Sequence, residues 1–261
     1  MTRRYFFFDI DGTLTDRTTN LKVPSAKEAL RKLREAGHFV AIDTGRAYYK
    51  AKPFFEENGF DNMVCNGGKG IVINGELVEN SPLVLEDAKQ LYREATEKGL
   101  GVILSLEDSL KVWAVNDLFR EQAGERREPT EYIIDPSLDV ESVPVIYKMY
   151  IAIGQEREAE LPTLAKLGHM WYEKEYVHVQ QDDKRGGILR MLELLGGRQE
   201  DVVVFGDDMN DVDMFTPPFY RVAMGNGNPA LMELADEVAP ANTDDGIYRV
   251  CEKNGWFEKA E

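Results

Sequence analysis

Two short apolar runs that end in carboxylates constrain the fold of this chain more than any other feature. Tyr5–Phe8 is followed at once by Asp9 and Asp11. Val202–Phe205 is followed, after one glycine, by Asp207. A continuous apolar run of four residues is typical of a strand buried on both faces of a parallel sheet. Because α/β sheets bind ligands at the carboxyl ends of such strands, we predict an α/β protein with a carboxylate-rich site at that edge.

The order of the patterns along the chain predicts one domain inserted into another. Strand and helix patterns alternate in the first third and again near the C-terminus. Between them the pattern changes to helices followed by paired strands, with a β-rich run over 145–153 and a predicted helix over 156–167. Such a segment is typical of an α+β unit inserted into an α/β host. We therefore predict a core formed by residues 1–81 and 182–261, and an inserted domain formed by residues 82–181.

Local signals mark the start of one helix and one tight turn. Ser25 and Glu28 have the spacing of a capping box, which predicts a helix that starts there and ends at Gly37. Asn74 and Gly75 lie between two apolar runs and predict a two-residue hairpin turn.

The composition limits the partners of the protein. The chain carries 47 acidic and 31 basic residues, a formal net charge of −16. This charge repels nucleic-acid phosphates and anionic lipid head groups, so we expect no nucleic acid and no membrane as a partner. Cys65 and Cys251 have no metal-ligand spacing and fit reduced thiols. The first apolar run ends too early for a signal peptide, and no stretch approaches the roughly 18 apolar residues of a membrane span, which predicts a cytoplasmic protein.

The two aspartates after the first strand fit a chemical role better than a structural one. If the strand geometry continues, its period of two places Asp9 and Asp11 on the same side and turns Ile10 away. Two carboxylates at the end of a buried strand are costly unless a cation neutralises them. An ordinary turn explains one aspartate and Gly12, but not a second carboxylate beside a phenylalanine-rich strand. We therefore expect Asp9 and Asp11 to be functional.

Two further loops follow predicted strands and add groups that bind anions. Thr44 and Gly45 offer a hydroxyl and backbone N–H groups at the start of a helix. Asn66 and Gly67 bring an amide and flexible backbone to the same predicted sheet edge. Taken alone, the first loop is a plain helix cap and the second a common loop. We regard Arg46, Asn66 and Gly67 as candidates for contacts to a substrate.

The last acidic cluster has the composition of a magnesium site. Asp207, Asp208, Asn210 and Asp211 follow an apolar strand, so that three carboxylates and one amide lie within five positions. Hard oxygen ligands of this kind suit Mg²⁺, which keeps several waters and bridges substrate phosphates. An acidic helix N-terminus favoured by the helix dipole explains one or two of these residues, but not the whole cluster.

In their order and spacing, these motifs resemble the four signatures of the haloacid dehalogenase superfamily. The motifs are Asp9-x-Asp11-Gly-Thr, Thr44-Gly-Arg, Lys184 and Gly206-Asp207-x-x-Asn210-Asp211. The 23 positions from Lys184 to Asp207, and an insertion placed before Lys184, are similar to the Cof-type sugar-phosphatase branch. The resemblance implies a Rossmann-like parallel-sheet core with an inserted α+β cap domain of the C2B type. The sequence departs from the pattern at Asp43, where a small residue is common, and at Gly68, where alanine is usual.

The resemblance also implies how the reaction proceeds. Asp9 would be the nucleophile that forms an aspartyl-phosphate, and Asp11 would be the general acid and base. Thr44, Gly45 and Lys184 would bind the oxygens of the transferred phosphoryl group. The local positive charge of Lys184 would then offset the acidic surface when a phosphorylated substrate binds.

A Mg²⁺ site follows from the same resemblance. The Asp9 and Asp207 carboxylates and the backbone carbonyl of Asp11 would hold the ion. Asn210 and Asp211 would support these ligands. The implied substrate is a small phosphorylated metabolite, with sugar phosphates as the leading class and phosphorylated cofactors such as pyridoxal phosphate or flavin mononucleotide behind.

Two other functions stay open at the level of the sequence. A phosphomutase on the same core would need a second phosphate site, which Arg120, Arg126 and Arg127 would supply. The glutamates between these arginines are explained more simply by a solvated charged loop. A non-catalytic sensor of a phosphorylated ligand would require the loss of a catalytic residue, and none is missing.

The residues that select a substrate are not evident from the sequence. Candidates for the leaving-group pocket, each equally compatible with a place in the cap core or surface, are Trp113, Tyr147, Met149 and His178. The sequence leaves the oligomeric state open.

Overall fold

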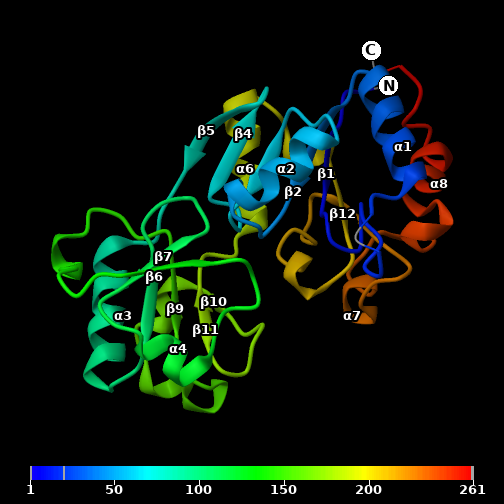
Figure 1. Ribbon diagram of the computed structural model, residues 1–261. Helices are drawn as coiled ribbons and strands as arrows, with labels where there is room; N and C mark the ends of the chain where they lie inside the picture. The colour runs from blue at the N-terminus through cyan, green and yellow to red at the C-terminus, as the bar shows by residue number, and fades with distance from the viewer. Residues whose placement is uncertain (1, 20, 260–261) are drawn as a thin grey trace. The chain divides into compact units, whose positions relative to one another are not determined.

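The computed structural model describes residues 2–19 and 21–259, and these divide into two compact units (Figure 1). The first unit contains the described residues of Met1–Arg46, Ala51–Glu79 and Asp183–Glu261. The second contains Ala47–Lys50 and Asn80–Asp182. Each unit has its own sheet and its own apolar core. The predicted α/β fold is confirmed, and the assignment of the second unit as a cap domain stays a prediction.

An eight-stranded sheet forms the centre of the first unit, in the order β14-β13-β12-β1-β2-β3-β4-β5. The strands from β14 to β3 are parallel, and β4 runs antiparallel to β3. The strand bounds are β1 (Tyr5–Phe8), β2 (Phe39–Asp43), β3 (Met63–Cys65), β4 (Gly70–Ile73), β5 (Glu76–Asn80), β12 (Val202–Gly206), β13 (Tyr220–Ala223) and β14 (Glu237–Val238). Because β1 lies between β12 and β2 in the middle of the sheet, its three phenylalanines are fully buried.

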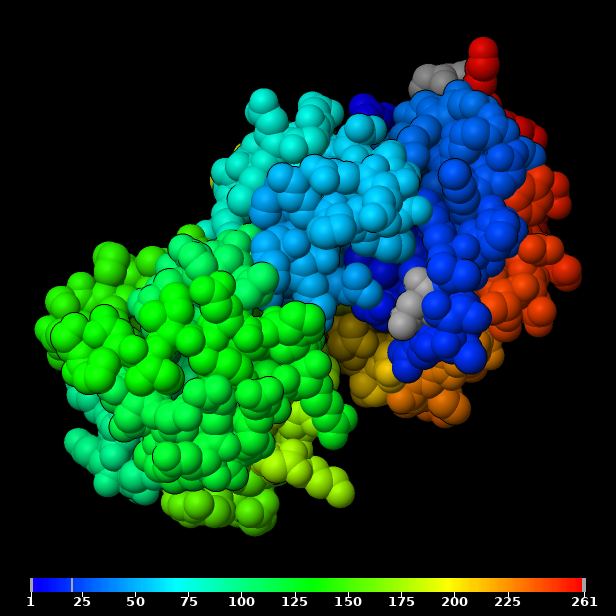
Figure 2. Space-filling model, in the orientation of Figure 1, coloured from blue at the N-terminus to red at the C-terminus, as the bar shows by residue number. Residues whose placement is uncertain are grey.

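Side chains of β1 alternate between the two faces of this sheet. Phe7 packs with Ile188 of α6, whereas the ring of Phe6 lies 5.1 Å from the ring of Trp256. Helices α1 and α8 pack side by side, and in Figure 2 their blue and red-orange atoms form adjoining surfaces. The helix bounds are α1 (Pro24–Glu35), α2 (Tyr48–Glu57), α6 (Lys184–Leu195), α7 (Pro229–Met232) and α8 (Gly246–Lys253), with short helices η3 (Gln199–Asp201), η4 (Met209–Asp211) and η5 (Asn242–Asp244).

The predicted capping box is wrong, although the predicted helix exists. Helix α1 begins at Pro24, its N-cap is Val23, and no side chain caps it. The fixed φ of proline suits the first helical position, which places the helix start ahead of Ser25. Glu28 pairs with Arg31 instead.

The predicted hairpin turn is confirmed. Asn74 and Gly75 separate β4 from β5 and have φ values of 52° and 82°. Positive φ at both central residues is the signature of the turn that matches the twist of a hairpin.

A six-stranded sheet forms the second unit, in the order β10-β11-β9-β6-β7-β8. All neighbours are antiparallel except β7 and β8, which are parallel. The strands are β6 (Val102–Ser105), β7 (Lys111–Ala114), β8 (Glu131–Ile134), β9 (Lys148–Ile151), β10 (His169–Met170) and β11 (Val177–Val179), and the helices are α3 (Leu85–Glu97), α4 (Leu118–Ala123), α5 (Leu164–Leu167), η1 (Val140–Ser142) and η2 (Gln155–Glu160).

One sequence-based expectation for this unit is wrong, and a second holds except at Arg126. Residues 156–167 do not form one helix, since Pro162 lies between η2 and α5 and interrupts the backbone hydrogen bonds. The charged segment was predicted to be solvated. Arg127 is exposed and pairs with Glu173, but the side chain of Arg126 is only 4% exposed. Met149, a candidate for the substrate pocket, lies in the apolar core.

Among the described residues, no helix combines the length and the apolar character that crossing a membrane requires.

Candidate active site

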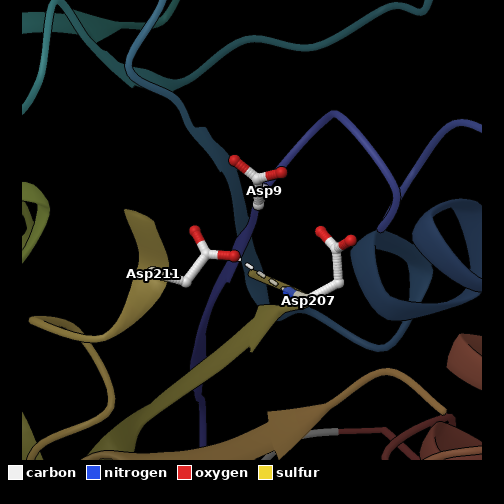
Figure 3. Close-up of side chains that lie close together, drawn as sticks. All are labelled: Asp9, Asp207 and Asp211. Carbon is white, nitrogen blue, oxygen red and sulfur yellow. Dashed lines mark hydrogen bonds between the residues drawn. The ribbon is translucent and has the colours of Figure 1, made fainter. Parts of the chain in front are cut away.

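Three carboxylates meet at the carboxyl edge of the parallel sheet (Figure 3). Asp9 follows β1 and Asp207 follows β12, and these strands pair in parallel, so both side chains leave the sheet at the same edge. Asp211 is the last residue of η4, in which Asn210 is half-buried. Asp9, Asp207 and Asp211 are almost fully buried, and one oxygen of each lies within 4.8 Å of the others. The fold thus concentrates three acidic groups at the predicted site.

Lys184 places a positive charge inside this cluster. It is the first residue of α6 and is fully buried. Its Nζ lies 2.7 Å from Asp9 Oδ1 and 2.5 Å from Asp211 Oδ1. Burial alone would lower the pKa of Lys184, but Asp211 and Asp9 raise it well above its usual value, so the ammonium stays charged. Removal of one partner from a buried ion pair costs about 3–5 kcal/mol.

Burial also changes the titration of two carboxyl groups. It raises the pKa of Asp9 to about 7, although Lys184 opposes the shift. It raises the pKa of Asp207 to about 6, although Arg17 opposes the shift. Both shifts describe a site that needs further positive charge before its carboxylates are fully ionised at neutral pH.

Arg17 supplies part of that charge from the loop after β1. Its guanidinium NH2 lies 2.8 Å from Asp207 Oδ2 and 2.9 Å from Asp208 Oδ2, and its side chain is half exposed. Gly12 makes this approach feasible. It has φ of +94°, and a Cβ there would lie 2.1 Å from Asp207 Oδ2 and 2.4 Å from Arg17 Nε.

The donor set fits a divalent metal ion. Asp207 Oδ2 is buried and forms an ion pair with the half-exposed Arg17, but it accepts no well-directed hydrogen bond from the described residues. Asp211 is differently engaged: its Oδ1 contacts Lys184, and its Oδ2 accepts the N–H groups of Asp207 and Asp208. Asp9 and Asp207 therefore have the freer oxygens, while Asp211 orients the loop that carries Asp207. Hard carboxylate oxygens of this kind suit Mg²⁺ or a similar cation.

Asp11 lies apart from the three buried carboxylates. Its side chain is half exposed, and both of its oxygens accept hydrogen bonds from Arg46, at 3.0 Å from Nε and 2.5 Å from NH2. Arg46, which was predicted as a candidate for substrate contacts, therefore holds the predicted general acid in this structure.

The loops after β2 and β3 lie together, as the sheet order predicts. Thr44 is buried, and its Oγ1 accepts the N–H of Arg46 at 3.2 Å. The N–H of Asn66 donates to the carbonyl of Arg46 at 2.7 Å. Gly45 has open space where a side chain would begin. This leaves room for an anion beside the Thr44 hydroxyl.

Tight packing explains the two glycines of the loop after β3, because this loop lies against the start of α6. The carbonyl of Gly67 accepts the N–H of Asp183, the residue before Lys184. A Cβ at Gly68 would lie 1.9 Å from the carbonyl oxygen of Asp183. Because position 68 has glycine where alanine is usual, the loop after β3 can approach the start of α6 and position Lys184.

Several supporting residues were not predicted. Thr13 Oγ1 donates to Asp207 Oδ1 at 3.2 Å. Asn226 Nδ2 donates to the carbonyl of Gly12 at 2.8 Å, and Asn242 Nδ2 donates to that of Thr15 at 2.8 Å. Thr13 belongs to the first motif and was detectable there. Asn226 and Asn242 have no local signal, because they act on a loop more than 200 residues away.

The fold and this site define an α/β protein in which buried carboxylates and a lysine meet at one edge of a parallel sheet. The chain belongs to the haloacid dehalogenase-like hydrolases, since a model of that family matches residues 6–251. The resemblance seen in the motifs is thereby confirmed. As a member with relatives named as phosphatases, the protein is a phosphoric monoester hydrolase.

Individual relatives match over almost the whole chain. "Putative phosphatase YkrA" of Bacillus subtilis (strain 168) is 30% identical over 255 residues, which cover 97% of this chain and 98% of YkrA. "Pyridoxal phosphate phosphatase YbhA" of Escherichia coli (strain K12) is 28% identical over 269 residues, covering 95% and 97%. A crystal structure of a hypothetical protein from Geobacillus kaustophilus HTA426 has a TM-score of 0.80 at 27% identity and covers 97% of this chain and 99% of that chain.

Proposed function

We propose that the protein is a Mg²⁺-dependent phosphatase that hydrolyses small phosphate monoesters through an aspartyl-phosphate on Asp9. One observation carries the proposal. Asp9 is a buried carboxylate at the end of β1, 2.7 Å from the Lys184 ammonium and beside Asp207 at the end of the paired strand β12. A carboxylate placed between a cation and metal-binding oxygens has the environment of a nucleophile for phosphoryl transfer.

The first half-reaction transfers the phosphoryl group to the protein. A carboxylate oxygen of Asp9 attacks phosphorus, a bond forms between them, and the bond from phosphorus to the ester oxygen breaks. Asp11 gives its proton to the departing alkoxide. Thr44, the Gly45 N–H and Lys184 hold the equatorial oxygens, which is the positioning and charge neutralisation that dominate this chemistry.

The second half-reaction releases phosphate. Asp11, now ionised, takes a proton from water, and the hydroxide attacks the phosphorus of the aspartyl-phosphate. The bond to Asp9 breaks, which restores the carboxylate and frees inorganic phosphate. Arg46 donates hydrogen bonds to both Asp11 oxygens in this structure. During turnover the Asp11 carboxyl group therefore breaks its hydrogen bonds with Arg46 and contacts the leaving-group oxygen instead.

The cation has defined protein ligands in this proposal. The Asp9 and Asp207 carboxylates and the Asp11 carbonyl would hold Mg²⁺, with Asn210 and Asp211 supporting them. When bound, Mg²⁺ neutralises phosphoryl oxygens and reduces their repulsion from the acidic cluster.

The substrate class is proposed from the family and its members. Sugar phosphates are the leading class, and pyridoxal phosphate is the second, because YbhA, which is 28% identical, carries that activity in its name. A panel of phosphate monoesters, assayed for phosphate release with purified protein and Mg²⁺, ranks these classes by kcat/KM.

The nucleophile is tested by Asp9→Asn. We expect no measurable phosphate release from an aryl phosphate, because the amide cannot form the acyl phosphate. The matched control is Asp244→Asn, the same chemical change at an exposed aspartate of the first unit, which should leave the rate unchanged. Substantial turnover by Asp9→Asn would disprove the assignment.

The general acid is tested by Asp11→Asn. Loss of general acid–base help typically slows turnover by about 10²–10⁴-fold. The loss should be smaller for an aryl phosphate with an acidic leaving group than for an alkyl phosphate, because the former leaves without a proton. Equal loss for the two esters would remove Asp11 from the protonation step.

A further inference from the structure

Both faces of the sheet of the second unit carry apolar clusters, and one of these faces also buries charge. Met149 and Val177 point to the apolar core beneath α3. Lys148, Tyr150 and His178 occupy alternate positions on the same strands, β9 and β11, and so lie on the opposite face. His178 and Tyr150 are register partners across the two strands.

Lys148 is a buried cation that forms no ion pair among the described residues. It is 9% exposed, and its Nζ donates to Gln180 Oε1 at 2.7 Å. Among the described residues, no carboxylate lies within ion-pair distance of it. Burial lowers the pKa of Lys148 to about 8, although Glu128 and Asp108 oppose the shift, so the ammonium is still mostly charged at pH 7. A buried charge of this kind is costly unless a partner neutralises it.

Arg126 brings a second cation to this face. Its guanidinium carbon lies 3.9 Å from the centre of the Tyr150 ring. NH1 donates to Thr130 Oγ1 at 3.1 Å, and NH2 donates to Glu128 Oε2 at 3.2 Å. The buried Nε has no hydrogen-bond partner among the described residues. An arginine that is buried against a ring and has a free donor is arranged to bind an oxyanion.

His178 adds a second polar atom that lacks a partner. The residue is 8% exposed, and its Nε2 is buried without a hydrogen bond among the described residues. Its ring stacks on Tyr176 at 5.0 Å and meets the edge of Tyr150 at 4.9 Å. These rings fix the orientation of the imidazole.

Positive charge is in excess at this face. The cations are Lys50, Arg126 and Lys148, and the carboxylates whose charges act on Lys148 are Glu128 and Asp108. Glu128 is shared, since Lys50 and Arg126 both pair with it. The side chains of Lys50 and Glu128 are 39% and 41% exposed, so solvent reaches the rim of the group. In a chain of net charge −16, a buried surplus of positive charge is unexpected without a ligand.

We propose that Arg126, Lys148 and His178, with Lys50 at the rim, form an anion-binding site for a compact oxyanion, the carboxylate or phosphate group of a small metabolite. The oxyanion accepts from Arg126 Nε and from the Lys148 ammonium, and so neutralises the buried surplus. Its source is either a second acidic group of the ester that the protein hydrolyses or a separate small molecule.

Binding is tested directly by nuclear magnetic resonance on the full chain. The chain has only three histidines, so the ring Cε1–H signal of His178 is assigned by its loss in His178→Gln. Inorganic phosphate is titrated in, with His38 and His169 as internal references. We expect a saturable shift of the His178 signal, and at least about tenfold weaker binding in Lys148→Met.

The matched control is Lys111→Met, which changes a 41% exposed lysine on β7 of the same unit and should bind phosphate as the unaltered protein does.

Thermal unfolding separates an effect on binding from an effect on folding. If the function of Lys148 is to bind an anion, its charge is unpaired and costly in the absence of phosphate. Without phosphate, Lys148→Met should then unfold at the same temperature as the unaltered protein or at a higher one. A His178 signal that does not move, or that moves equally in Lys148→Met, overturns the proposal.

Kinetics identify the source of the oxyanion, and this arm rests on the proposed phosphatase function. Glucose 6-phosphate and 6-phosphogluconate differ in the oxidation state of C1, and the second ester is an open chain with a carboxylate at that carbon. If the oxyanion belongs to the substrate, Lys148→Met raises KM for 6-phosphogluconate about tenfold and leaves that for glucose 6-phosphate unchanged. If both KM values are unchanged while the resonance shift depends on Lys148, the ligand is a separate molecule. Absence of turnover with every ester would contradict the phosphatase function alone, because the titration still decides the site.

Discussion

Arg17 occupies the side of Asp207 where a divalent cation would also bind. The guanidinium lies 2.8 Å from Asp207 Oδ2 and forms an ion pair with that oxygen. A protein cation and a metal cation that share one carboxylate oxygen compete for it. The pair is half exposed on the arginine side, so the competition amounts to about 1 kcal/mol or less.

We therefore predict that Arg17→Ala binds Mg²⁺ more tightly, by up to about fivefold, as measured by titration calorimetry. Arg17→Lys keeps the charge and should lie close to the unaltered protein. Weaker Mg²⁺ binding by Arg17→Ala would mean that Arg17 shapes the metal site rather than competing for it.

Asp43 is a buried carboxyl group that no hydrogen bond satisfies. It is fully buried at the end of β2, and neither of its oxygens has a partner among the described residues. Burial raises its pKa well above the ordinary 3.8, although Lys184 opposes the shift. Above about pH 4 the unfolded chain releases a proton that the folded chain keeps, so the unfolding free energy falls as the pH rises toward neutrality.

Asp43→Asn should remove this dependence on pH. We expect the variant to match the unaltered protein near pH 4 and to be more stable than it at pH 7, because it has no carboxyl group that ionises on unfolding. Urea unfolding of metal-free protein at both values measures the difference. Asp244→Asn, at an exposed position, should show no such gain, and a gain of the same size there would refute the burial argument.

At the scale of the elements, the local sequence determines where some strands end and where the chain turns. The parallel pairing of β1 with β12 brings Asp9 and Asp207 to one edge, and this follows from two apolar runs that both end in aspartate. The hairpin from β4 to β5 also follows from its turn residues. The start of α1 does not follow from the Ser25 signal, because the neighbouring proline competes for the first helical position.

The hairpin turn supports a quantitative prediction. A Cβ at Gly75 would meet nothing within 4 Å, so Gly75→Ala adds no clash and costs only the strain of its φ of +82°, about 1–2 kcal/mol. Asn74→Gly keeps positive φ accessible and should change the unfolding free energy by less than about 0.5 kcal/mol. Urea denaturation compares the two variants, and an unchanged stability of Gly75→Ala would show that the turn has another geometry in solution.

At the scale of the whole molecule, the two units have separate cores and contain different candidate sites. The candidate metal ligands lie in the first unit, and the anion site that we propose lies in the second. The tryptophans are divided in the same way, with Trp113 and Trp171 in the second unit and the buried Trp256 in the first.

Mg²⁺ should therefore stabilise the first unit selectively. In a Trp113→Phe/Trp171→Phe protein, fluorescence reports the surroundings of Trp256 alone. Saturation to about 100 times Kd should stabilise the unit by about 2.7 kcal/mol and raise the midpoint of its thermal transition. The same background with Asp207→Asn should show little shift. An equal shift in both proteins would place the ion elsewhere.

The sequence alone was sufficient for the fold class, the order of the motifs, the hairpin and the grouping of Asp9 with Asp207. These features depend on local periodicity, on turn chemistry and on the rule that parallel strands share a carboxyl edge. Only the tertiary structure decided that Lys184 lies between Asp9 and Asp211, that Arg17 faces Asp207, and that Arg126 is buried on Tyr150. The physical reason is separation: Lys184 and Asp9 are 175 positions apart, and no local pattern encodes which distant partner a charged side chain meets or how much water surrounds the pair.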